Sequence, residues 1–309
     1  MLGAFAHDDI HGDFAMITQT QPRLDRMLGL SQHGFHTLAL AQWGTAGSHD
    51  LAICVHGLTR NGRDFDALGE AMSATHRVLC PDVVGRGGSD WLPSEDAYGY
   101  PQYMADMAAV IARGHAAAVD WVGTSMGGLI GMMLAAQPRT PIRRLVINDV
   151  GPFVPKEALQ RLADYVGADP HFADFDDGLA YIKRIHAPFG DLSDAQWHHL
   201  ASHSLRPDDR KGGYRLAYDP KIGAPFRDPG GIEDVDLWKL WEQIQCPVLV
   251  LRGAESDLLL PETAEKMTQR GPKAELIEVP NCGHAPALLD ADQIGAITDW
   301  LARTAHQRL

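Results

Sequence analysis

A serine between two glycines, at the junction of a strand and a helix, constrains the fold of this chain most. The segment Gly123-Thr124-Ser125-Met126-Gly127 follows the apolar run 119–122 and opens a helical pattern that extends to Gln137. The serine must adopt a strained backbone conformation that lifts its hydroxyl clear of the sheet, and side chains at 123 and 127 would collide with the neighbouring strand and helix. The pattern therefore predicts a tight turn that presents Ser125 as a nucleophile.

An acid and a histidine follow later in the chain, each directly after an expected strand. Asp257 comes after the strand 247–251, and His284 after the strand 274–279. A serine hydroxyl is a poor nucleophile at neutral pH, so it needs a base that takes its proton, and the base needs a carboxylate that orients it. The order Ser125, Asp257, His284 supplies all three groups.

Two further turns carry a resemblance to a known family. His56-Gly57-Leu58 follows the apolar strand 51–55, and residues 82–89 read Asp-Val-Val-Gly-Arg-Gly-Gly-Ser. The second is similar to the Asp-x-x-Gly-x-Gly-x-Ser turn common in α/β-hydrolases. With the serine turn and the order of acid and histidine, the chain resembles an α/β-hydrolase fold enzyme over about residues 25–305.

The resemblance implies roles for individual residues. Ser125 would be the nucleophile, His284 the base and Asp257 the acid, because 253–257 matches the acid loop of the family. Asp149, after the strand 143–148, is an alternative acid or an anchor for the segment that follows it. The oxyanion hole would consist of the backbone N–H groups of Leu58 and Met126, the latter aided by the helix N-terminus, and His56 would shape the turn.

Apolar runs and helical periodicity alternate along the chain, which predicts an α/β fold with a mainly parallel, doubly wound sheet. By resemblance the sheet has eight strands. An opening hairpin is expected at 27–30 and 35–42. Further strands are expected near 51–55, 77–80, 119–122, 143–148, 247–251 and 274–279. Helices are expected near 64–73, 101–114, 126–137, 260–270 and 290–304.

Between the strands at 143–148 and 247–251, amphipathic helical patterns start near Lys156, Asp176, Asp194 and Asp234, with no convincing strand. By resemblance this segment is a helical cap at 152–240, inserted after strand six of a core made of 21–151 and 241–309. Residues 1–20 lack periodicity and are expected to be a disordered leader. The cap is rich in aromatics, most of which are expected to form its own core. Trp197, Trp238 and Trp241 are the candidates for the substrate pocket, with the core of the cap as their alternative place.

Composition limits the partners of the chain. With a formal net charge of −13, the surface would repel nucleic acid and anionic membranes. No apolar run approaches the ~20 residues that span a bilayer. The four cysteines, at 54, 80, 246 and 282, show no metal-binding spacing and suit a reducing compartment. We therefore expect a cytoplasmic protein that acts on a small molecule.

These features predict a serine hydrolase that cleaves small, mostly apolar carboxylic esters through an acyl-serine intermediate, as a carboxylesterase does. Ser125 argues against epoxide hydrolases and haloalkane dehalogenases, which use aspartate at this turn. Carbon–carbon bond hydrolases of the meta-cleavage type, enol-lactonases, thioesterases and amidases remain alternatives. So does a small-molecule sensor built on a hydrolase scaffold. We find no motif that calls for a metal or cofactor.

Overall fold

A central sheet of eight strands organises the chain. The computed structural model describes residues 21–45, 48, 50–227 and 231–305; the leader expected at 1–20 lies outside them. The strand order is β1-β2-β4-β3-β5-β6-β12-β13, and all pairs from β4 to β13 are parallel. The strands are β1 (Arg23–Ser31), β2 (Gly34–Trp43), β3 (Asp50–Val55), β4 (His76–Pro81), β5 (Val119–Thr124), β6 (Ile142–Asn148), β12 (Val248–Gly253) and β13 (Glu275–Val279). The predicted doubly wound α/β sheet is confirmed.

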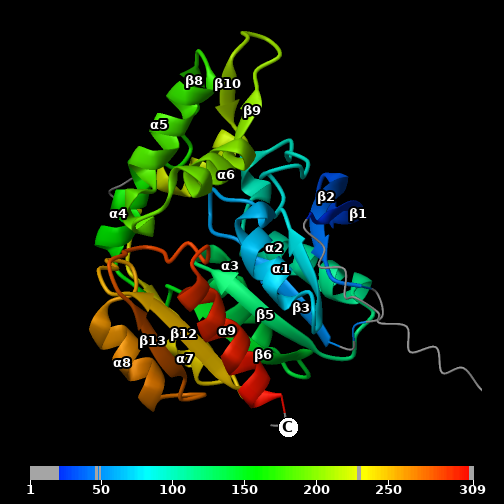
Figure 1. Cartoon of the computed structure of the whole chain (residues 1–309), viewed down its shortest axis with the longest axis vertical. Coiled ribbons are helices and arrows are strands. Elements are labelled where there is room, and N and C mark those ends of the chain that lie inside the picture. Colours follow the sequence, from blue (N-terminus) through cyan, green and yellow to red (C-terminus); the bar gives the residue numbers. More distant parts are fainter. Residues whose placement is uncertain (1–20, 46–47, 49, 228–230, 306–309) are drawn as a thin grey trace, which may run out of the picture.

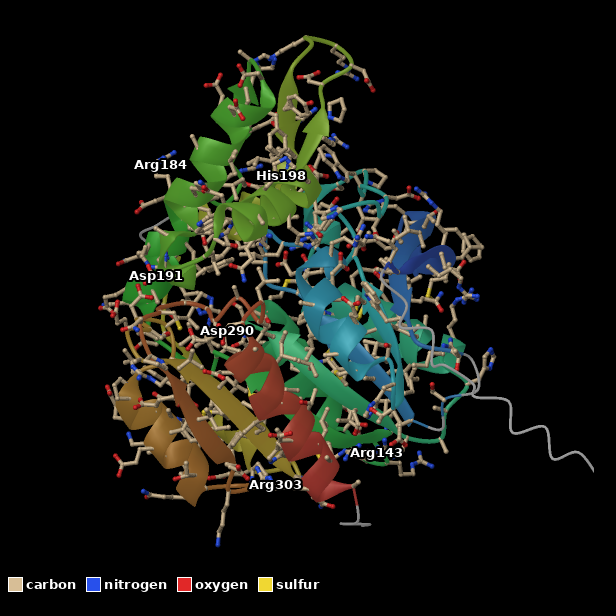
Figure 2. All side chains as sticks on the ribbon, in the orientation of Figure 1. Arg143, Arg184, Asp191, His198, Asp290 and Arg303 are labelled. Carbon is tan, nitrogen blue, oxygen red and sulfur yellow. The ribbon has the colours of Figure 1, made fainter. Side chains whose placement is uncertain are left out.

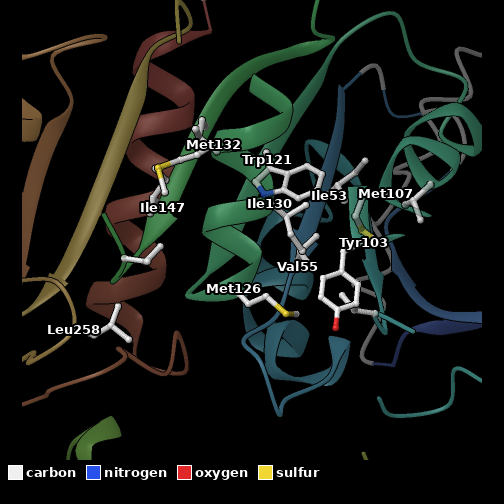
Figure 3. Close-up of a cluster of buried hydrophobic side chains, with 14 of the residues drawn as sticks. Ile53, Val55, Tyr103, Met107, Trp121, Met126, Ile130, Met132, Ile147 and Leu258 are labelled. Atoms are coloured by element: carbon white, nitrogen blue, oxygen red, sulfur yellow. The ribbon is translucent and has the colours of Figure 1, made fainter. Parts of the chain in front are cut away.

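Helices cover both faces of the sheet (Figure 1). They are α1 (Asp66–Met72), α2 (Tyr100–Arg113), α3 (Met126–Ala135), α8 (Pro261–Gln269) and α9 (Ala291–Thr304). Neighbouring strand residues point to opposite faces. Trp121 accordingly packs with Ile130 of α3 and Met107 of α2 (Figure 3), whereas Val122 packs in a second core with Trp300 of α9. Burial on both faces explains why the central strands are continuous apolar runs.

The chain leaves the sheet after β6 and returns at β12. The inserted segment holds α4 (Lys156–Ala163), α5 (Phe175–Ile185), α6 (Asp194–Ser204) and the short α7 (Trp238–Trp241). Its outer surface carries charged side chains such as Arg184 and Asp191 (Figure 2).

The expectation of no strand in this segment is wrong. Five short strands occur there: β7 (Phe153–Val154), β8 (His171–Phe172), β9 (Leu205–Pro207), β10 (Tyr214–Leu216) and β11 (Val235–Asp236). They form a three-stranded and a two-stranded sheet. Strands of two or three residues are too short to show an alternating pattern in the sequence.

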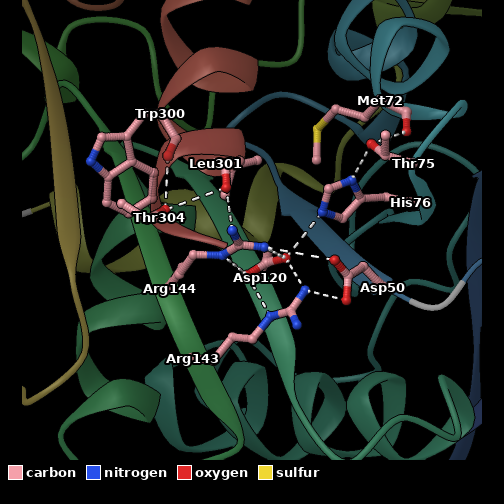
Figure 4. A network of polar contacts seen from close by, with 10 residues as sticks. All are labelled: Asp50, Met72, Thr75, His76, Asp120, Arg143, Arg144, Trp300, Leu301 and Thr304. Carbon is pink, nitrogen blue, oxygen red and sulfur yellow. Dashed lines mark hydrogen bonds and ion pairs between the residues drawn. The ribbon is translucent and has the colours of Figure 1, made fainter. Parts of the chain in front are cut away.

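A buried ionic network joins strands of the central sheet to a helix packed against it (Figure 4). The Asp120 carboxylate, on β5, accepts hydrogen bonds from His76, Arg143 and Arg144. Burial alone would raise the pKa of Asp120, but these donors hold it below its usual value. Arg144 also donates to the Leu301 carbonyl of α9. The network therefore ties β4, β5, β6 and α9 together.

Two glycines test the packing around the turn after β5. A Cβ at Gly127 would overlap the Val55 carbonyl, whereas a Cβ at Gly295, within α9, meets nothing within 4 Å. We expect Gly127→Ala to lower the free energy of unfolding by about 1–3 kcal/mol or more through overpacking. Gly295→Ala should raise it by up to about 1 kcal/mol, because alanine favours the helix. Urea unfolding measures both, and equal effects would contradict the close approach at Gly127.

Candidate active site

Ser125 occupies a strained turn between β5 and α3. Its φ is 51° and its ψ is −114°. The Ser125 N–H donates to the Asn148 carbonyl at 2.9 Å, and its carbonyl accepts from Leu129 N–H at 3.0 Å. A Cβ at Gly123 would overlap the Gly127 backbone. The predicted turn is therefore present, and it is held between β6 and the first turn of α3.

His284 lies between a hydroxyl and a carboxylate. It follows β13, and its Nε2 lies 2.9 Å from Ser125 Oγ while its Nδ1 lies 2.7 Å from Asp149 Oδ2. With the proton on Nδ1 donated to Asp149, Nε2 has a lone pair directed at the serine hydroxyl. The arrangement can therefore remove a proton from Ser125 and stabilise the imidazolium that results.

Asp149 is fully buried at the end of β6. Its φ is 57°, a conformation that few residues other than glycine adopt. The carboxylate accepts hydrogen bonds from Gly253 N–H at 2.8 Å and from Ser256 Oγ at 2.7 Å, in addition to His284. Three donors replace the water that the charged group loses on burial. The loop after β12 therefore supplies donors to the acid, while the acid itself comes from β6.

Asp257 is not in contact with His284, so the expectation that it orients the imidazole is wrong. Its side chain is 51% exposed and forms a bidentate ion pair with Arg161 of α4, with Arg161 Nη2 at 2.8 Å from Oδ1. The turn after β12 directs the Ser256 hydroxyl toward Asp149. Asp257 therefore links the inserted segment to the sheet.

The two expected oxyanion donors lie near the nucleophile. Leu58 and Met126 line the same cavity as Ser125. Over the described residues, neither backbone N–H has a hydrogen-bond acceptor. Met126 is the first residue of α3, where N–H groups have no partner within the helix. Both groups are thus available to a ligand oxygen.

His56 has the structural part that the sequence predicts. Its Nδ1 donates to the Gly57 carbonyl at 2.7 Å, and its Nε2 accepts from Val83 N–H at 2.9 Å. Burial lowers the pKa of His56 to about 4, so the ring is neutral and has one donor and one acceptor. It joins the turns after β3 and β4.

Arg86 is a feature that sequence reasoning missed. It is fully buried, and its guanidinium donates to the Leu58 carbonyl at 2.9 Å, to the Val84 carbonyl at 2.8 Å and to the Tyr103 hydroxyl at 3.0 Å. Its Nη2 also lies 3.7 Å from Met126 Sδ. Within the part of the chain that the structure describes, no carboxylate pairs with it. A buried positive charge therefore lies beside both expected oxyanion residues.

An apolar cavity of 580 Å³ adjoins Ser125. Its walls come from α2, α3, the residue Val150 after β6, α4, and residues 222–226 and 232–237. Trp197, Trp238 and Trp241 do not line it, so the expectation of a pocket role for them is wrong.

The tryptophans have other surroundings. Trp197 is buried in the core of the inserted segment. Trp241 donates its indole N–H to the Arg270 carbonyl. The Arg270 guanidinium lies over the Trp238 ring, with its Cζ 4.4 Å from the centre of that ring.

Among the described residues, two clusters have metal-ligand atoms within 4.8 Å of one another: Asp66 with His199 and His203, and Asp120 with Asp50 and His76. In each, arginine already holds a carboxylate, through Arg63 on Asp66 and Arg144 on Asp120. An adjacent guanidinium opposes a second cation. Neither donor set fits a resident metal.

The chain belongs to the alpha/beta hydrolase family, whose sequence profile matches residues 52–296. It is accordingly a hydrolase. A 3-hydroxybutyrate-oligomer hydrolase of Cupriavidus necator is 45% identical over 279 residues, which cover 88% of this chain and 95% of that protein. A 2-(acetamidomethylene)succinate hydrolase of Mesorhizobium japonicum is 28% identical, covering 77% of this chain and 82% of its own.

The fold is also similar to solved structures. An alpha/beta hydrolase from Novosphingobium aromaticivorans superposes with a TM-score of 0.81 at 35% identity, covering 91% of this chain and 98% of that one. Among the helices that the structure describes, none is both long and apolar enough to span a bilayer.

Arg86 offers a test of the geometry around Leu58. Arg86→Met leaves the Leu58 and Val84 carbonyls without their donor, and each unsatisfied buried acceptor costs about 1–3 kcal/mol. Tyr103→Phe, as the matched control, removes one hydrogen bond worth about 1 kcal/mol. We expect Arg86→Met to lower the urea unfolding midpoint clearly more than Tyr103→Phe. Equal midpoints would contradict the hydrogen-bonding role of the guanidinium.

Proposed function

We propose that the protein is a serine hydrolase that cleaves the ester bonds of short 3-hydroxybutyrate oligomers. The observation that carries the mechanism is the hydrogen-bonded series Ser125–His284–Asp149 beside an apolar cavity. The substrate is suggested by the 45% identity to the Cupriavidus necator enzyme over nearly the full length of both chains. Both observations support ester hydrolysis rather than ligand sensing alone.

In this mechanism His284 Nε2 takes the proton of Ser125 as Oγ attacks the ester carbonyl carbon. The oxyanion accepts hydrogen bonds from the N–H groups of Leu58 and Met126, each worth about 3–4 kcal/mol in the barrier. His284 then gives its proton to the departing alcohol, and the acyl-serine remains. A water molecule, deprotonated by His284, attacks the acyl-serine, releases the acid and restores Ser125.

Arg86 contributes to stabilisation of the oxyanion through its contacts with Leu58 and Met126. Its charge is fixed, since the guanidinium stays protonated, and its surroundings are buried. A positive charge in a site of low dielectric constant favours negative charge that develops nearby. The hydrogen bond to the Leu58 carbonyl also holds the turn in place. Arg86 is therefore a positioning residue that acts through Leu58 and Met126.

Ser125 tests the proposed function directly. The purified enzyme should convert the 3-hydroxybutyrate dimer and trimer to monomer, and a fluorophosphonate probe should label one residue, Ser125. Ser125→Ala should abolish labelling and reduce oligomer turnover to background, because the remaining residues cannot form the acyl-enzyme. Chromatography of the products and peptide mapping measure these outcomes. Turnover of p-nitrophenyl esters or vinylogous diketones, but not of oligomers, would contradict the proposed substrate.

The two aspartates separate the acid of the site from its neighbour. Asp149→Asn keeps the shape but favours the wrong imidazole tautomer, and we expect kcat to fall by a factor on the order of 10⁴. Asp257→Asn, the matched control, removes an exposed ion pair worth about 0.2–1 kcal/mol and should leave kcat within a few fold. Steady-state kinetics with p-nitrophenyl butyrate measures both. A severe loss of kcat in Asp257→Asn, with little loss in Asp149→Asn, would show that Asp257 is the acid of the site.

A further inference from the structure

The cavity beside Ser125 has almost no charge. Over the part of the chain that the structure describes, its lining contains no lysine, arginine or histidine, and its one carboxylate is Glu233. Burial of a carboxylate without a partner is strongly unfavourable. A negative ligand group would also be repelled by Glu233. The cavity therefore suits a neutral chain and excludes an acidic one.

Among the described residues, one tyrosine hydroxyl in the lining has no hydrogen-bond partner. Of three tyrosines there, Tyr98 donates to Asp219 at 2.7 Å, and Tyr103 accepts from Arg86. Tyr100, at the start of α2, has no hydrogen-bond partner among the described residues. Burial raises the pKa of Tyr100 above its usual value, so the hydroxyl keeps its proton at neutral pH. It can donate to a ligand oxygen.

We propose that this cavity is the acyl pocket of the enzyme, that the Tyr100 hydroxyl binds the oxygen on C3 of a 3-hydroxyacyl chain, and that Glu233 helps to reject acidic chains. That oxygen is the terminal hydroxyl, or the ester oxygen that joins the next unit. The inference rests on the proposed function and assigns the direction in which an oligomer binds.

The chemistry of the oligomer gives that direction. For every ester bond in the chain, the hydroxyl end lies on the acyl side and the carboxylate end on the alcohol side. A cavity that excludes carboxylates can accept only the acyl side. Attack by Ser125 then breaks the bond between the carbonyl carbon and the ester oxygen. The fragment with the carboxylate end leaves first, with the proton from His284 on its new hydroxyl.

The second half of the reaction releases the acyl chain as an acid. Water gives a proton to His284 and adds to the acyl-serine carbonyl, the bond to Ser125 Oγ breaks, and His284 returns the proton to the serine. The new carboxylate forms beside Ser125, where the ester carbonyl was, and the rest of the fragment lies in the cavity. The cavity therefore has to bind only the neutral part of the acyl chain.

Two esters that differ in one hydroxyl test the role of Tyr100. We would compare kcat/KM for p-nitrophenyl 3-hydroxybutyrate, as each enantiomer, and p-nitrophenyl butyrate, which have the same leaving group. The wild-type ratio should favour one hydroxy ester, and Tyr100→Phe should reduce that ratio by between about twofold and tenfold, as expected for one hydrogen bond. Tyr181→Phe, outside the cavity lining, is the matched control and should leave the ratio unchanged.

Acidic acyl chains test the exclusion. Mono-p-nitrophenyl glutarate should be turned over at least tenfold more slowly than the butyrate ester, and Glu233→Gln should raise the ratio of kcat/KM for the glutarate ester to kcat/KM for the butyrate ester. An unchanged hydroxy-to-butyrate ratio in Tyr100→Phe, or wild-type preference for the glutarate ester, would overturn the inference. These ratios are read on activated esters, so they are independent of whether oligomers are cleaved. Loss of oligomer turnover alone contradicts only the proposed function.

Discussion

The buried carboxylate of Asp149 is the group on which the site depends. It stands at the end of β6, accepts hydrogen bonds from the loop after β12, and holds the imidazole that follows β13. Asn148, the residue before it, donates to the Pro286 carbonyl and to Thr124 Oγ1, next to the nucleophile. A buried charge tolerates little misplacement of its donors, because an unmade bond costs more than a made one gains. Four strand ends are therefore held in register by one charge and its neighbour.

Sequence reasoning succeeded where a residue's role is local. The turn around Ser125 could be predicted because its glycines meet backbone only a few residues away or on the adjacent strand. The acid could not, because its position depends on a contact across 135 residues, and Asp149 and Asp257 both follow strands that end at the same edge. What separates them is burial and partners in the fold: Asp149 is fully buried against the loop after β12, whereas Asp257 lies at the surface beside Arg161.

Other features of the site leave no local signal in the sequence. Arg86 sits in a glycine-rich turn, yet its side chain is fully buried and contacts residues from the turn after β3, from α2 and from α3. The tryptophans of the inserted segment are candidates for a pocket because of their size, but large apolar side chains are most often buried in a core. Trp241 is fully buried. The cavity is lined instead by leucine, valine, isoleucine and methionine side chains together with three tyrosines and one phenylalanine.

Two buried ionic sites show how the same fold uses charge differently. The Asp120 network is compensated by two arginines, and it joins β5 and β6 to α9. Arg86 has only carbonyl, hydroxyl and sulfur partners among the described residues, and it contacts Leu58 and Met126, the proposed oxyanion residues. A compensated charge adds little field at a distance, whereas an uncompensated one favours a negative charge nearby. The positive charge at Arg86 and the neutral cavity therefore complement each other: in the proposed mechanism the first acts beside the reacting carbonyl group, and the second holds the neutral acyl chain.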